Sequence, residues 1–254
     1  MIYTIAQHEL VKLFKTGKIW QLLALCQFIL GLIFYWLMEE FLFKSQNLLL
    51  ENTRSVGITE EVIHPLFAWA ALFFFFITPL LATQCVTQER KTHTLDLYLT
   101  SPLSSLEIVM GKFIGIFLGE IFLLLPVLIM PLLITLNDHL DIGQFISGLF
   151  GLILLLGATL SLGIFVSSLA KEPFISTLVI FISLLLLTAL EWTAHFLTPS
   201  LQWIAELALL HHCQNFLSGI INTQDIIYYV FFTVLFLSLG AFRLNKESYF
   251  KRST

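Results

Sequence analysis

The chain contains almost none of the residue patterns that enzymes use. Gly111-Lys112 is the nearest approach to a nucleotide-binding P-loop, but Leu106 stands where that motif needs its first glycine, and no Ser or Thr follows the lysine. HExxH, GxSxG and CxxC patterns do not occur either. We therefore expect that this chain is not an enzyme and that it has no catalytic residue, metal or cofactor of its own.

Glu120 is an ionisable residue inside a long apolar stretch, about 13 residues into a helix and so roughly 20 Å along it. An ionisable group at such a depth in a membrane is costly and is a functional candidate by default. It would line a translocation path or bond across a dimer. The alternative is a protonated Glu that is hydrogen-bonded to a neighbouring helix.

Histidine and cysteine residues give weaker signals. His211-His212-Cys213 have side chains that bind soft metals, but adjacent residues on a helix point in different directions, so we predict no metal site. The other cysteines, Cys26 and Cys85, lie within apolar segments, and no disulfide framework is implied.

Composition indicates a membrane protein. Hydrophobic residues make up 57% of the 254 residues and charged residues only 12%, whereas soluble domains carry about 25% charge. The net charge of −4 also makes nucleic acid an unsuitable partner. We expect one domain, residues 1–254, with the lipid bilayer as its solvent.

Apolar stretches of sufficient length predict an all-α fold with six transmembrane helices. Their expected ranges are 19–38, 65–86, 107–136, 144–169, 174–196 and 226–242. Ser104 and Glu107 form the pattern of a capping box at the start of the third span, and Pro126 and Pro131 should kink or break it near its end. The third span also has a close-packing face, with glycines four residues apart at Gly111, Gly115 and Gly119.

Two further helical segments flank these spans. Residues 1–17 have apolar side chains at helical spacing, which predicts an amphipathic helix in the cytoplasmic interface; the alternative is a basic flank that only sets orientation. Residues 197–225 mix apolar and polar side chains, with a helical pattern of about 14 residues from Leu201 that is too short to cross. A re-entrant or interfacial segment on the outward side fits this stretch.

Eleven of the 13 Lys and Arg residues fall on one side of these spans. They are Lys12, Lys15, Lys18, Arg90, Lys91, Lys112, Lys171, Arg243, Lys246, Lys251 and Arg252, and only Lys44 and Arg54 fall on the other. Cytoplasmic loops carry an excess of Lys and Arg, so we expect this side, with both termini, to face the cytoplasm.

The most informative cytoplasmic segment is 88–104, between the second and third spans. It is charged at its start, then apolar, and it stops at Pro102. Leu95 and Leu99 lie four residues apart, so a short helix here would present an apolar ridge flanked by charge. Such a ridge suits a groove in a cytoplasmic protein, or alternatively rests on the lipid headgroups.

The sequence here resembles type-2 ABC export permeases, and most closely the branch of the gliding-motility permease and the permease for nitrous-oxide-reductase maturation. The resemblance lies in Glu89-Arg90-Lys91, residues 94–104 and 108–113, residues 141–143, 154–158 and 163–169, and Asn215 to Ile221 with 225–229. It covers nearly the whole chain. One departure is His93, where many relatives have Gly.

The resemblance implies a permease with a coupling helix in 88–104, driven by a separate P-loop ATPase that uses ATP and Mg. Two permease chains, identical or closely homologous, and two ATPase chains would form the exporter in a bacterial inner membrane, with room for an additional periplasmic or membrane subunit. The residues expected to couple the two proteins are Glu89, Arg90, Leu95, Leu97, Leu99 and Pro102.

Two other functions remain open at this point. A stand-alone secondary transporter or channel would need a dense intramembrane polar relay or paired broken helices, and Glu120 alone gives little of this. A membrane-anchored scaffold would carry a larger domain on one side, which the sequence lacks. Nothing in the sequence identifies the transported substrate.

Overall fold

The computed structural model describes residues 1–51, 57–92, 94–95, 103–134, 141–194 and 207–252, and helices are the regular elements found there. Six of the helical stretches within these ranges are long and apolar enough to cross a membrane. The elements are α1 (Ile2–Lys15), α2 (Lys18–Glu51), the π-helix η1 (Thr59–Ile63), α3 (His64–Cys85), α4 (Thr87–Lys91), α6 (Ser105–Ile134), α7 (Ile142–Leu169), α8 (Pro173–Ala194), α9 (Leu209–Leu217) and α10 (Thr223–Arg252).

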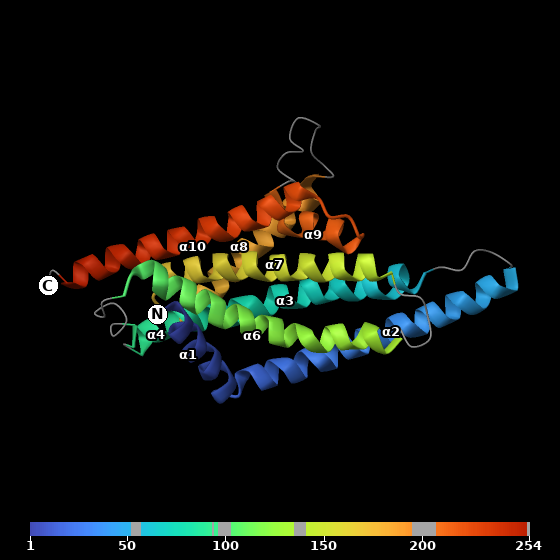
Figure 1. Cartoon of the computed structure of the whole chain (residues 1–254), viewed down its shortest axis with the longest axis horizontal. Coiled ribbons are helices and arrows are strands. Elements are labelled where there is room, and N and C mark those ends of the chain that lie inside the picture. The colour runs from blue at the N-terminus through green and yellow to red at the C-terminus, as the bar shows by residue number, and fades with distance from the viewer. Residues whose placement is uncertain (52–56, 93, 96–102, 135–140, 195–206, 253–254) are drawn as a thin grey trace.

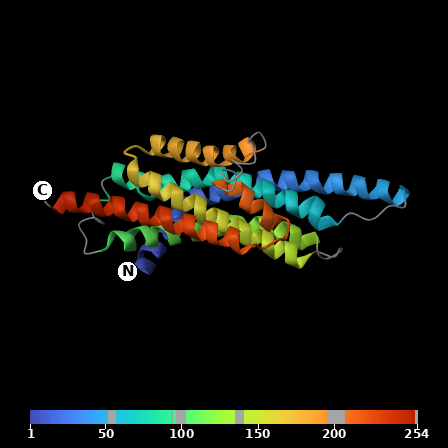
Figure 2. The same cartoon turned by 90° about the horizontal axis from the view of Figure 1, so that it is seen from above.

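The long helices run roughly side by side in an elongated bundle (Figure 1). The start of α1, the end of α10 and helix α4 all lie at one end of this bundle, in both views (Figures 1 and 2). We call this the basal end and the other the distal end. An even number of crossings places both ends of the chain on the same side, as this arrangement shows.

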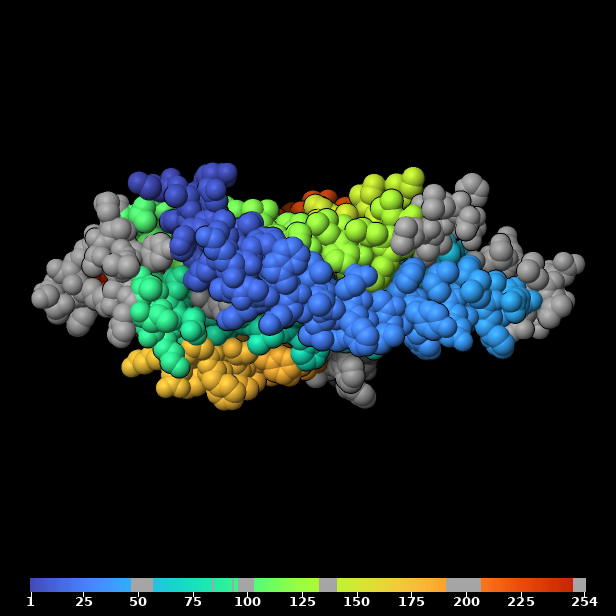
Figure 3. All heavy atoms as spheres, turned by 90° about the horizontal axis from the view of Figure 1, so that it is seen from below, coloured from blue at the N-terminus to red at the C-terminus, as the bar shows by residue number. Residues whose placement is uncertain are grey.

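Helices α3 and α7 form the centre of the bundle, and both bury most of their residues. Helices α2 and α8 are mostly exposed and lie on the outside; α2 runs along one surface in the space-filling view (Figure 3). Their exposed side chains are large and apolar, for example Phe28 and Trp36 on α2 and Ile182 on α8. Such surfaces suit contact with lipid chains.

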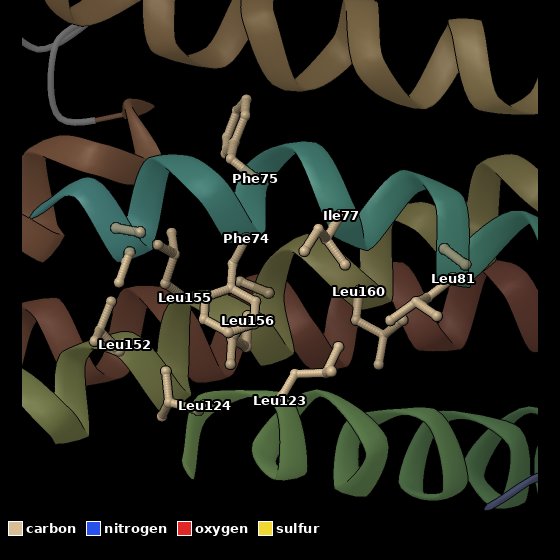
Figure 4. Packing of buried hydrophobic residues seen from close by; sticks show 14 of the residues in the cluster. Phe74, Phe75, Ile77, Leu81, Leu123, Leu124, Leu152, Leu155, Leu156 and Leu160 are labelled. Carbon is tan, nitrogen blue, oxygen red and sulfur yellow. The ribbon is translucent and has the colours of Figure 1, made fainter. Parts of the chain in front are cut away.

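The core lies where α3, α6 and α7 meet (Figure 4). Phe74 and Leu81 of α3 pack there with Leu123 of α6 and with Leu156 of α7. Lipid chains are as apolar as leucine, so close packing rather than exclusion of water holds such helices together.

Local sequence determines several helix ends. Ser104 Oγ accepts a hydrogen bond from the Glu107 backbone N–H at 3.2 Å, and Glu107 Oε2 accepts one from the Ser104 N–H at 3.0 Å, which is the predicted capping box. Asp141 Oδ1 caps α7 by accepting from the N–H groups of Gly143 and Gln144. Gly219, with a φ of 82°, ends α9 in a Schellman turn, because glycine adopts this left-handed conformation without a steric penalty.

Some helices differ from their expected ranges. Helix α2 continues to Glu51 rather than ending at 38, because no Gly or Pro interrupts this stretch and Lys44 pairs with Glu40 one turn away at 3.0 Å. Helix α10 likewise continues well past 242. Pro126 and Pro131 do not break α6, which continues through both to Ile134. In the segment 197–225, residues 197–206 lie outside the described ranges, and helix α9 and the first residues of α10 follow them.

Candidate functional site

Four charged side chains meet at the basal end and form what we call the basal ion cluster: Glu9, Lys12, Glu89 and Lys112. Lys112 Nζ lies 2.6 Å from Glu9 Oε1 and 2.6 Å from Glu89 Oε2. Lys12 Nζ lies 2.7 Å from Glu89 Oε1 and 3.4 Å from Glu9 Oε2. Two ammonium groups and two carboxylates therefore alternate, and their formal charges cancel.

The cluster joins three elements that are distant in sequence. Glu9 and Lys12 come from α1, Glu89 from α4 and Lys112 from α6. The Lys112 side chain is fully buried, and Glu9 and Glu89 are nearly so, at 3% and 4% exposed. Charges at such depth are stable only when each is paired, so removing any one leaves a costly unpaired charge.

Close approach of α1 to α6 makes this arrangement possible. A Cβ atom at Gly111 would lie 2.7 Å from Ile5 Cβ, and one at Gly115 would lie 2.7 Å from the Ala6 carbonyl oxygen. At Gly119 the nearest atom would be Leu13 Cδ1, at 3.0 Å. The three glycines of the predicted packing face thus meet α1 of the same chain, and a larger residue at Gly111 or Gly115 would push α1 away from Lys112.

The charges stabilise one another. Burial alone would raise the pKa of Glu9, but the nearby ammonium groups of Lys112 and Lys12 outweigh it and hold this pKa below its usual value. Burial alone would lower the pKa of Lys12, but the carboxylates of Glu9 and Glu89 outweigh this effect and hold the pKa above its usual value. Both residues therefore stay charged at neutral pH.

Arg90, the neighbour of Glu89, connects α4 to the other side of the bundle. Its Nη1 donates to the Ala170 carbonyl at 2.5 Å, and its Nη2 donates to the Ser168 carbonyl at 3.1 Å and to Glu247 Oε2 at 2.6 Å. These partners belong to the end of α7 and to α10. Adjacent residues of α4 are thus bonded to α1 and α6 on one side and to α7 and α10 on the other.

Thr87 adds a third attachment of α4. Its backbone N–H donates to Ser167 Oγ at 3.1 Å, and its hydroxyl donates to the Ser167 carbonyl at 2.8 Å. Both residues are fully buried. Helix α4 is therefore fixed to the end of α7 by neutral hydrogen bonds as well as by Arg90.

The structure describes only one of the remaining residues that were expected to couple the chain to a partner. Leu95 is 1% exposed and belongs to the chain's own hydrophobic core, so it does not contribute to an exposed apolar ridge. Leu97, Leu99 and Pro102 lie outside the described residues. Among the predicted coupling residues that the structure describes, Glu89 and Arg90 are those that form ion pairs with other helices.

Glu120 lies within α6 and is fully buried by helices of the same chain. The Thr78 hydroxyl on α3 lies close enough to interact with this carboxyl, and neither side chain has an ion-pair partner or a further hydrogen bond among the described residues. The structure gives Glu120 no exposed surface for contact with a second chain in this conformation.

The distal end carries a different polar group. His212 Nδ1 lies 2.5 Å from Asp225 Oδ1, and Asn215 Nδ2 donates to Asp225 Oδ2 at 3.0 Å. These bonds hold α9 against the start of α10. His211, His212 and Cys213 do not converge on one point, and the described part of the chain contains no group of three metal-binding side chains.

Sequence reasoning missed Glu9, Lys12 and Lys112 as members of one site. One signal was available: Glu9 falls between Ile5 and Leu13 at four-residue spacing, on the face of α1 that is otherwise apolar. A charge on an apolar face needs a buried partner of opposite sign.

A comparison with protein families decides what kind of protein this is. Residues 3–249 match the sequence model of the ABC-2 family of transporter proteins. The chain belongs to this family. The match covers the six apolar helices, α1 and the basal ion cluster.

ABC-2 family membership identifies the chain as a permease component of an ABC transporter, a membrane transport component that is not itself catalytic, and it implies a partner ATPase. It also agrees with the six apolar helices in identifying a membrane protein. The comparison with curated proteins gives no match.

Proposed function

We propose that this ABC-2 permease is the transmembrane subunit of an ATP-driven exporter, and that segment 88–104 receives the motion of a cytoplasmic ATPase. The observation that carries this proposal is the attachment of α4 on two sides. Glu89 is bonded to Lys12 and Lys112, and Arg90 is bonded to the end of α7 and to Glu247. A displacement of α4 therefore acts on four helices at once.

This attachment suits a rigid-body mechanism. Buried ion pairs transmit force without large rearrangement, because separating them exposes unpaired charges to an apolar surrounding. When the ATPase chains close on ATP and Mg, α4 would move with α1 and α6 and pull on α7 and α10 through Arg90. The helices then change their packing as units and open a path for the substrate.

The assembly we propose contains two permease chains and two ATPase chains in a bacterial inner membrane, with both termini in the cytoplasm. The placement of both ends of the chain at the basal end supports the last point. The resemblance in sequence favours the branch of the gliding-motility and nitrous-oxide-reductase-maturation permeases. The export direction follows from the same resemblance.

The test detects motion at the distal end of the bundle, and it does not require the transported substrate to be known. The chain's own cysteines are buried, so a cysteine introduced by Ser218→Cys at the exposed end of α9 is labelled selectively. In the co-purified complex, we expect ATP with vanadate to change its labelling rate. Arg90→Gln should remove this change while ATP hydrolysis continues, whereas Lys44→Gln, at a distal ion pair, should leave it intact. Absence of an ATPase from the purified material would refute the proposal.

A second candidate is a stand-alone secondary transporter or channel, and the observation that favours it is the buried carboxyl of Glu120, which has no ion-pair partner in the described part of the chain. Such a protein would drive transport with an ion gradient in liposomes that contain no ATPase. Loss of that flux in Glu120→Gln would support this candidate over the exporter.

A further inference from the structure

A basic cavity of about 470 Å³ lies at the basal end, beside Arg90. Its walls come from α4, from the end of α7 with the turn into α8, and from α10. The residues that line it are Arg90, Leu169, Lys171, Arg243, Lys246 and Glu247. A volume of this size is typical of sites that hold small molecules or headgroups.

The charges in this cavity do not cancel. Glu247 is the one acidic residue in its lining, and it is already paired with Arg90 at 2.6 Å. Within the described ranges, no ion pair is found for Lys171, Arg243 or Lys246. Glu172, the next residue after Lys171, is exposed and makes no ion pair with them. Three positive charges are thus left for a ligand of opposite sign.

The rim of the cavity is apolar on the side that faces the bundle surface. Leu169, which lines the cavity, is 46% exposed. Leu239, one turn before Arg243 on α10, is 39% exposed. Leu239 belongs to the apolar outer surface of α10, so the positive charges of Arg243 and Lys246 begin where this apolar surface ends.

We propose that this cavity binds the headgroup of an anionic phospholipid, with its acyl chains along Leu169 and Leu239. Basic pockets between transmembrane helices near the cytoplasmic surface are suited to phosphate headgroups, because lysine and arginine supply both charge and hydrogen-bond donors. An acidic protein segment would satisfy the charges but would leave the exposed Leu169 and Leu239 without an apolar partner. The lipid satisfies both surfaces at once.

The assignment does not depend on the chain being an exporter, because it rests on the cavity and its charges alone. It does place a lipid next to the Arg90–Glu247 ion pair, which lies in the cavity wall. A headgroup phosphate there would place a second anionic group next to Arg90.

The test uses purified full-length chain in nanodiscs of phosphatidylcholine with a small fraction of phosphatidylglycerol, and native mass spectrometry of the lipids that stay bound. The test variant is Lys171→Gln with Lys246→Gln. The matched control is Lys15→Gln with Lys18→Gln, which also removes two exposed basal lysines but outside the cavity. At about fivefold in affinity per lysine near a membrane surface, we expect a loss of about 30-fold in phosphatidylglycerol retention in the test variant.

Three results would overturn the proposal. Equal losses in both double variants would show a diffuse surface charge rather than a site. Displacement of the lipid by glycerol 3-phosphate alone would show a site for free anions. Unchanged phosphatidylglycerol retention, with loss of a co-purified ATPase from the test variant only, would show that the cavity binds a protein. Equal thermal stability of the two variants confirms that both are folded.

Discussion

Lys112 and Glu120 lie on the same helix, α6, about 12 Å apart along its axis, and both side chains are fully buried. Lys112 has carboxylate partners at 2.6 Å on two other elements. Glu120 has no ion-pair partner among the described residues. The same helix therefore carries one ionisable group that is fixed by its neighbours and another that is not.

This difference separates two roles. A buried charge with all its partners in place fixes the elements that supply them, and here these are α1 and α4. A buried carboxyl without an ion-pair partner holds little in place, so its presence is explained by another conformation or by function rather than by stability. We therefore expect a mutation of Lys112 to lower the stability of the protein strongly and a mutation of Glu120 to change it little.

The largest effect is expected for Lys112→Met. This change keeps the volume of the side chain but leaves Glu9 and Glu89 buried without their main partner, at a cost of about 3–5 kcal/mol. Thermal unfolding in detergent measures it. Lys91→Met, at an exposed lysine of the same end, serves as the control and should leave the unfolding temperature unchanged. Equal behaviour of the two variants would contradict an anchoring role for Lys112.

The next largest effect is expected for Gly115→Ala. The added methyl group would lie 2.7 Å from the Ala6 carbonyl oxygen and 2.8 Å from Glu9 Cβ, so α1 must shift away from the ion cluster. Overpacking of this kind costs about 1–3 kcal/mol. At Gly157 on α7 the nearest atom would be 3.5 Å away, so Gly157→Ala should unfold at the native temperature or above it. A stable Gly115→Ala protein would show that α1 is not held closely.

A smaller effect is expected for Glu120→Gln. The amide has nearly the same shape as the carboxyl, and no ion pair is lost, so we expect a change in stability below about 1 kcal/mol. The same thermal unfolding measurement applies. A loss as large as that of Lys112→Met would mean that Glu120 has a partner that this conformation does not show.

Thr78→Val gives the smallest expected effect. Apart from its contact with the Glu120 carboxyl, the buried Thr78 hydroxyl has no hydrogen-bond partner among the described residues, so an apolar group of the same shape should change stability by less than about 1 kcal/mol. Thr83 on the same helix donates to the Pro79 carbonyl at 2.8 Å and contacts the Thr177 hydroxyl at 2.9 Å. Thr83→Val should therefore lower stability by about 1 kcal/mol. Thermal unfolding measures both variants, and we expect a larger fall in the unfolding temperature for Thr83→Val than for Thr78→Val.

Much of the fold follows from local sequence. Length and hydropathy predict the six apolar helices, and Ser104 with Glu107 predicts the start of α6 to within a residue. The far ends of α2 and α10 were predicted too short, because hydropathy marks where a helix leaves lipid and not where it ends. Hydrogen bonding and ion pairs such as Lys44 with Glu40 extend helices into polar surroundings.

The site was predicted less completely. Glu89 and Arg90 could be singled out from the segment that contains them, but their partners come from positions far away in sequence, such as Lys112 and Glu247. Spacing along one helix cannot show which distant helix lies opposite. Leu95 shows the reverse error: its four-residue spacing from Leu99 suggested an exposed ridge, whereas tertiary packing buries it.

The most direct measurement is the accessibility of a cysteine at position 91, next to Arg90, introduced by Lys91→Cys. Lys91 is exposed, whereas the three native cysteines are buried. With a membrane-impermeant maleimide, we predict labelling in inside-out vesicles but not in right-side-out ones, and slower labelling when the ATPase is bound than after it is stripped away. Labelling in right-side-out vesicles, or a rate that does not respond to the ATPase, would contradict the view that α4 receives the motion of a cytoplasmic partner.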